Sequence, residues 1–89
     1  MQLPVDSELR ALASEIVSWM ASQPDWRELE GSDVFQSPNY SGGYEALEEA
    51  FTFSYYDPDR REWWFQLGAA DVEGLADGRT HSITIREPG

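Results

Sequence analysis

The sequence predicts an α+β protein in which an N-terminal helix and a short second helix pack on a three- or four-stranded antiparallel sheet. Apolar residues recur every three or four positions in the first part of the chain, as in an amphipathic helix. From Phe51 onward the apolar period changes to two, as in strands. The length of 89 residues favours a single domain spanning 1–89, because chains split into separate cores only above about 250 residues.

The first helix is predicted from an apolar stripe formed by Leu9, Leu12, Ile16 and Trp19, widened by Ala13, Val17 and Met20. Asp6 or Ser7 can cap its N-terminus, and the helix must end before Pro24, since the residue before a proline avoids the α conformation. Pro24 can open a second short helix, with Trp26 and Leu29 as its apolar anchors. The Gly31-Ser32-Asp33 cluster is expected to end it.

Residues 34–50 allow two interpretations. Val34 and Phe35 can form a short strand, whereas Pro38-Asn39 and Gly42-Gly43 are turn signals. Tyr44, Leu47 and Phe51 then follow a helical spacing, which favours a short helix over residues 44–50. The alternative is that this stretch leads into a long strand.

A hairpin is predicted over residues 51–67, and the apolar pattern selects its register. A three-residue loop, 58–60, places Tyr55 opposite Trp63, Phe53 opposite Phe65 and Phe51 opposite Leu67. Because a one-residue slip moves every side chain to the other face, only this register collects the apolar groups on one side. The other face then pairs Thr52, Ser54 and Tyr56 with Gln66, Trp64 and Glu62.

A second hairpin is predicted at the C-terminal end, where Asp77-Gly78 suits a tight turn. It would place Val72 opposite Ile83 and Ala70 opposite Ile85, with a bend at Gly68 and Ala69. The alternative makes residues 70–76 helical, with Gly78 just past the helix end. The core is expected to bring Leu9, Leu12, Ile16 and Met20 onto Phe51, Phe53, Phe65, Leu67, Val72 and Ile83.

Charge is the main functional signal. The chain has 17 Asp and Glu against six basic residues, all arginine, for a net charge of −11. Such a field repels nucleic acid and anionic membranes, and it attracts basic protein surfaces. The chain has no cysteine, which excludes disulfides and thiolate metal sites. No long apolar run or signal-type N-terminus is evident, so a cytoplasmic location is expected.

Catalytic signals are weak. His81 is the single histidine, and there is no Gly-x-Ser-x-Gly nucleophile motif. The acids at Asp57 and Asp59 do not follow the spacing of a calcium-binding loop, and Asp57-Pro58-Asp59 is more simply a turn. The sequence therefore predicts a protein that is not an enzyme and needs no metal or cofactor.

The candidate partner-binding residues are acids and an aromatic pair forced off the core: Glu45, Glu48, Glu49, Tyr56, Asp59, Glu62 and Trp64. Acids two apart on a strand lie ~6.6 Å apart, and successive helix turns lie ~5.4 Å apart, close to the spacing of phosphates. Further acids in such a row would be Asp25, Glu28, Glu30, Asp33 and Asp57.

The leading hypothesis is an inhibitor that binds a basic, nucleic-acid-handling partner by mimicking nucleic acid. In size and charge alone the chain is similar to small acidic bacterial or phage proteins that block nucleases or CRISPR-type complexes, and to immunity proteins. The alternative is a small structural subunit or regulatory adaptor, for example a homodimer formed through the exposed sheet face.

Overall fold

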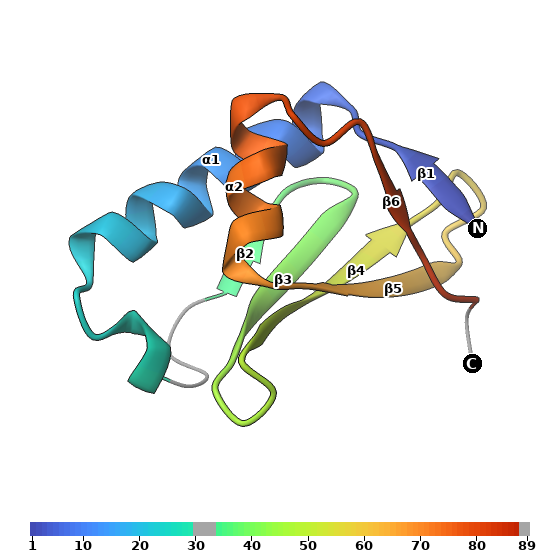
Figure 1. Cartoon of the computed structure of the whole chain (residues 1–89). Helices are drawn as coiled ribbons and strands as arrows, with labels where there is room; N and C mark the ends of the chain where they lie inside the picture. The colour runs from blue at the N-terminus through green and yellow to red at the C-terminus, as the bar shows by residue number, and fades with distance from the viewer. Residues whose placement is uncertain (30–33, 88–89) are drawn as a thin grey trace.

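The computed structural model describes residues 1–29 and 34–87, and it has the predicted α+β architecture. Two helices pack on one face of a four-stranded antiparallel sheet of order β2-β3-β4-β5, beside a small β1-β6 sheet (Figure 1). The elements are β1 (Gln2–Pro4), α1 (Ser7–Ser22), the 3₁₀ turn η1 (Trp26–Glu28), β2 (Val34–Gln36), β3 (Tyr40–Glu45), β4 (Ala50–Tyr56), β5 (Glu62–Leu67), α2 (Ala69–Asp77) and β6 (Ser82–Thr84).

The N-terminal helix is confirmed, with Asp6 as its cap. The Asp6 carboxylate accepts the Leu9 amide at 2.8 Å, and α1 ends at Ser22, before Pro24. The short second helix is a single 3₁₀ turn with Asp25 in the cap position, so Pro24 lies outside it. Trp26 is buried as expected. The predicted end of this helix at 31–33 lies outside the described residues.

The hairpin of β4 and β5 is confirmed in the predicted register: Phe53 pairs with Phe65 and Tyr55 with Trp63. The loop spans residues 58–60, and Arg60 takes the left-handed conformation, with φ 62°, which three-residue hairpin loops require at one position. Asp57 has the predicted turn role, because its carboxylate accepts the Trp63 indole and the Arg61 amide, each at 2.9 Å. These two hydrogen bonds lower the pKa of Asp57.

The preferred helix over residues 44–50 is wrong, and the alternative of a lead-in to a long strand is only partly right, because residues 44–45 end β3, residues 46–49 form a turn and only Ala50 belongs to β4. Tyr44 lies near the end of β3, opposite Phe51 of β4, and both side chains are buried. Leu47 lies between them in the turn and is 90% exposed. The turn expected at Gly42-Gly43 is also wrong, because both glycines lie inside β3. A side chain on Gly42 would meet the Phe53 ring at 2.5 Å, so the missing side chain is what lets this ring pack against the strand.

The preferred second hairpin is wrong as well, since Ala69–Asp77 forms α2 and Gly78 ends it with φ 87°. Val72 and Leu75 are fully buried at helical spacing, and α2 packs on α1, where Arg10 donates to the Leu75 carbonyl at 2.9 Å. Gly68 precedes the helix as its N-cap and is not a strand bend. Ile83 pairs instead with Leu3 of β1, a strand that the sequence analysis did not predict.

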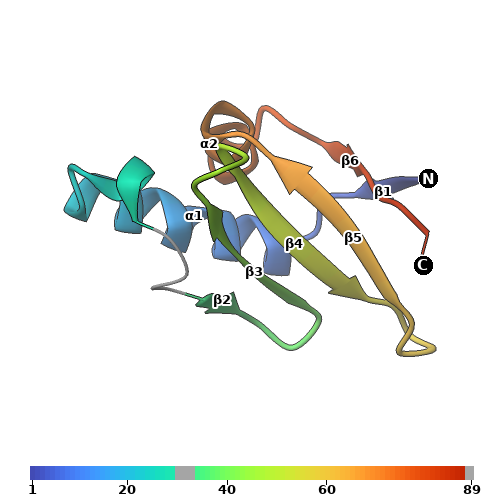
Figure 2. The same ribbon diagram turned by 90° about the horizontal axis from the view of Figure 1, so that it is seen from below.

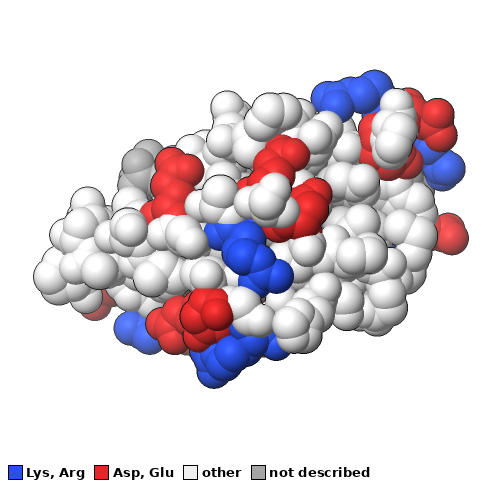
Figure 3. All heavy atoms as spheres, turned by 90° about the horizontal axis from the view of Figure 1, so that it is seen from above, with Lys and Arg blue, Asp and Glu red and all other residues white. Residues whose placement is uncertain are grey.

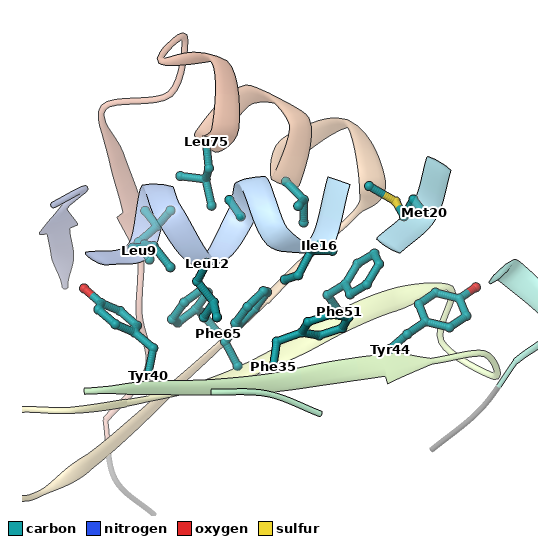
Figure 4. Packing of buried hydrophobic residues seen from close by; sticks show 14 of the residues in the cluster. Leu9, Leu12, Ile16, Met20, Phe35, Tyr40, Tyr44, Phe51, Phe65 and Leu75 are labelled. Carbon is teal, nitrogen blue, oxygen red and sulfur yellow. The ribbon is translucent and has the colours of Figure 1, made fainter. Parts of the chain in front are cut away.

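The predicted core is otherwise confirmed, and it fills only one side of the sheet. Figure 4 shows Leu9, Leu12, Ile16 and Met20 of α1 pointing toward Phe35, Phe51 and Phe65 on the sheet. Of the predicted core members, only Leu67 is partly exposed. The opposite face of the sheet, called the outer face below, has no helix or strand across it in the view from below (Figure 2).

Candidate partner-binding surfaces

The six arginines do little to neutralise the acids. Among residues 1–29 and 34–87 the one ion pair joins Arg79 to Asp77, at 2.6 Å. Arg10 binds a backbone carbonyl. The other four guanidinium groups lie over aromatic rings, within about 6 Å of the ring centres, as in cation–π contacts: Arg27 on Trp26, Arg60 on Tyr56, Arg61 on Trp63 and Arg86 on Trp64.

Many carboxylates consequently have no internal partner. In the described part of the chain, nine carboxylates form no hydrogen bond or ion pair with another described residue: Glu15, Asp25, Glu28, Glu45, Glu49, Asp59, Asp71, Glu73 and Glu87. Figure 3 views the helix side, where acidic side chains lie in separate groups with arginines between them. No continuous acidic row is visible on that side.

Two acids at the start of α1 serve the fold instead. Asp6 accepts the hydroxyl of the buried Tyr40 at 3.2 Å, and burial together with this negative neighbour raises the pKa of Tyr40. Glu8 accepts the Ser37 hydroxyl at 2.6 Å and the Asn39 backbone and side-chain amides at 2.7 and 2.9 Å. Partial burial acts to raise the pKa of Glu8, but these hydrogen bonds outweigh it and lower the pKa.

The outer face carries several of the predicted partner-binding residues. Glu62 of β5 accepts hydrogen bonds from Ser54 at 2.6 Å and Tyr56 at 3.4 Å. At the other end of the same strand, Gln66 donates a hydrogen bond to Glu48. The structure therefore places two of the candidate acids at the two ends of one polar surface.

Trp64 lies between these acids on the outer face, but it is only half-exposed. The Arg86 guanidinium lies 4.5 Å from its ring centre. The two backbones also form an antiparallel bridge, with the Arg86 amide donating to the Trp64 carbonyl at 2.8 Å. The C-terminal segment thus covers part of the ring that the sequence analysis expected to be free.

The second surface is the turn between β3 and β4, with the η1 segment beside it. Glu45, Glu48 and Glu49 surround the exposed Leu47. The ring centres of Trp26 and Tyr44 lie 5.0 Å apart, which brings Asp25 and Glu28 of the η1 segment to the same end of the molecule. This acidic end contains a pocket of about 350 Å³ lined by Trp26, Arg27, Tyr44, Ala46, Glu49 and Ala69.

The structure divides the candidate acids between two ends of the sheet. Glu45 and Glu48 lie at one end of the β3–β4–β5 sheet, whereas Asp59 lies in the β4–β5 turn at the other end, beyond Glu62 (Figure 1). Glu30 and Asp33 lie outside the described residues. The pocket was missed because its walls come from three distant segments, and the exposed Leu47 was missed because its spacing resembled a helix.

Signals for other chemistry remain weak. The His81 side chain is exposed, and the neighbouring Ser82 hydroxyl donates to Gln2 at 3.2 Å. In the part of the chain that the structure describes, no group of three His, Asp or Glu side chains is arranged to hold a metal ion. No described helix has the length and apolar character needed to cross a bilayer. Comparisons with protein families, curated proteins and solved structures found no match.

Proposed function

We propose that this protein is a non-enzymatic inhibitor that binds a basic surface of a partner protein and occupies the groove where that partner holds nucleic acid. The observation that supports this proposal is the set of carboxylates without internal cations. Four of the six arginines lie on aromatic rings and only one forms an ion pair among the described residues. Most described carboxylates therefore have no cationic partner within the molecule and can pair with a basic surface.

A field of this kind has a specific physical effect on association. Complementary charge steers a basic partner toward the acids and raises the association rate, and at about 0.1 M salt this attraction is largely screened beyond about 10 Å. Glu62 and Gln66, the contact residue of Glu48, are four positions apart on β5, or ~13 Å along a strand. Along a single nucleic-acid strand, a phosphate and the next phosphate but one have a similar spacing. This surface therefore has dimensions suited to mimicry of a phosphate backbone.

The test starts with affinity capture of partners at low and at high salt, followed by purification of the partner. Nucleic acid should compete with the protein for that partner, and binding should weaken steeply as salt rises. Replacing Glu45 and Glu48 together by glutamine should slow association, whereas the matched change of Glu15 and Glu73, on the helices, should affect it less. If the partner binds nucleic acid and this protein at once with no mutual weakening, the mimicry proposal is wrong.

A structural subunit or adaptor is the second candidate, because no described helix or strand crosses the outer face of the sheet and Trp64 is only partly covered there, by the Arg86 segment. A homodimer formed through this face would bury Trp64, and its dissociation constant would depend little on salt. Sedimentation equilibrium at low and high salt separates the two proposals. A salt-resistant dimer that Trp64→Ala converts to a monomer would support the adaptor proposal. A monomer under both conditions would show that the protein does not form the homodimer.

A further inference from the structure

Two side chains of opposite charge line the pocket at the acidic end without forming an ion pair. Arg27 and Glu49 both line it, yet no ion pair joins them in the described residues. The Arg27 guanidinium instead lies 4.4 Å from the ring centre of Trp26. The Glu49 carboxylate is consequently available to a ligand that enters the pocket.

The walls of the pocket suit a flat cation. Trp26 and Tyr44 contribute aromatic rings, and Ala46 and Ala69 contribute small apolar side chains. A guanidinium over an aromatic face is attracted by the ring's negative face and loses little hydration, because it is weakly hydrated. In the free protein Arg27 occupies this position over Trp26, and Phe51 stacks on the same ring with centres 5.7 Å apart. An entering guanidinium therefore reaches the Trp26 ring by displacing Arg27.

The local charge balance favours a cation over an anion. Glu49 lines the pocket, while Glu45, Glu48, Asp25 and Glu28 lie on the segments that form it. Arg27 is the only basic residue on these two described segments, 25–29 and 44–50. Five acids against one arginine give this end a negative potential, which raises the local concentration of cationic groups.

We infer that this pocket receives an arginine side chain of the partner protein, with Trp26 and Tyr44 as its aromatic walls and Glu49 as the carboxylate that binds the guanidinium. The inference rests on the proposed function for its source of arginine, since nucleic-acid-binding surfaces are rich in this residue. The exposed Leu47, two residues before Glu49, would contact the surface around the inserted side chain.

The backbone at Glu49 is consistent with a role for its side chain. Glu49 has φ 53°, in the left-handed region that glycine and asparagine adopt more easily than glutamate. Glycine at this position would relieve the local strain of the turn. Glu49→Gly should therefore raise the melting temperature while it weakens arginine binding at least as much as Glu49→Gln does, which separates the carboxylate's role in binding from any role in the fold.

The experiment uses the full chain and a blocked amino acid, N-acetyl-arginine amide, titrated while the amide and indole signals are followed by NMR. The Trp26 indole and the Ala46 and Glu49 amides should shift together. Glu49→Gln should weaken binding by about two- to fivefold, as expected for loss of one exposed charge pair. Glu73→Gln removes the same charge from α2 and should leave the affinity nearly unchanged.

Replacement of Arg27 provides a second test, in which arginine binding should become stronger instead of weaker. Arg27→Gln removes a like charge and frees the Trp26 ring, so it should strengthen arginine binding; Arg79→Gln, the matched loss of a distant cation, should have little effect. If N-acetyl-glutamate amide binds instead and Arg27→Gln abolishes it, the pocket recognises anions and the inference is overturned. Equal losses in Glu49→Gln and Glu73→Gln would also overturn it. Because no partner protein is used, these outcomes leave the proposed function to its own test.

Discussion

Glu8 joins the N-terminal helix to the turn between β2 and β3, and its replacement by glutamine tests how this fold is held together. The carboxylate accepts three hydrogen bonds, one from Ser37 and two from Asn39. It also lies in the first turn of α1, where a negative charge is favoured by the helix dipole. Glutamine keeps the shape of the side chain, but it loses the charge and presents a donor where a second acceptor is needed.

The expected cost of Glu8→Gln follows from these contacts. Hydrogen bonds to a charged group are worth roughly 1.5–3 kcal/mol when buried, and the helix dipole adds roughly 0.3–1 kcal/mol. The site is only half-buried, so water can replace part of each lost interaction. We therefore expect the free energy of unfolding to fall by about 1–2 kcal/mol at neutral pH.

The pKa of Glu8 determines how the stability difference between the two proteins changes with pH. The pKa of Glu8 is lowered in the folded protein, so the folded state binds fewer protons at this site than the unfolded state. The stabilisation is fully present above the unfolded pKa, near 4.5, and it is lost as the pH falls through the lower, folded pKa. The difference between the parent protein and Glu8→Gln should thus disappear in acid.

The assay is urea unfolding of both proteins at about pH 7 and about pH 3, with Glu15→Gln as the control. Glu15 is an exposed residue of the same helix and has no hydrogen-bond partner in the described residues, so its change should alter stability by less than about 0.5 kcal/mol. A Glu8→Gln loss that is equally large at both pH values would refute the reasoning, since it would show that shape and not charge holds the turn.

Two further predictions follow from packing and from charge. Gly42→Ala should lower the free energy of unfolding by about 1–2 kcal/mol, because its new methyl group would meet the Phe53 ring at 2.5 Å, and that ring is buried and stacked on Phe65. Gly43→Ala, on the outer face, is the control, and a neutral Gly42→Ala in urea melts would show that Phe53 can move aside. Raising salt from low to moderate concentration should raise the melting temperature by roughly 5 °C, the shift for about 1 kcal/mol at this size. A flat or falling trend in calorimetry would mean that the acids are already compensated.

The parts of the fold that were predictable are those in which two independent signals agree. In the β4–β5 hairpin, the alternation of apolar residues and the need for one apolar face select the same three-residue loop. In α1, the helical stripe agrees with the cap at Asp6 and the stop at Pro24. Each of these elements uses local chemistry that its own residues specify.

The parts that were wrong depend on contacts between distant residues. The segment 69–77 is short, and its apolar pattern fits a strand or a helix. The helix is favoured because it lets Val72 and Leu75 be buried together against α1. Gly42 resembles a turn residue until Phe53 is packed against it. The pocket could not be predicted for the same reason, since Trp26, Tyr44 and Ala69 come together only after the sheet and both helices are in place.

The placement of the arginines affects the stability of the free protein and bears on the proposed function. An arginine paired with a carboxylate would relieve the repulsion among acids, yet four of the six lie on aromatic rings, where they cover apolar surface and leave the acids uncompensated. The isolated protein consequently retains self-repulsion, which lowers its stability. The basic partner proposed above would relieve that repulsion in the complex, so the charges that repel one another in the free protein would add to the affinity for such a partner. Under this proposal, neutralising surface acids should stabilise the free protein and weaken the complex.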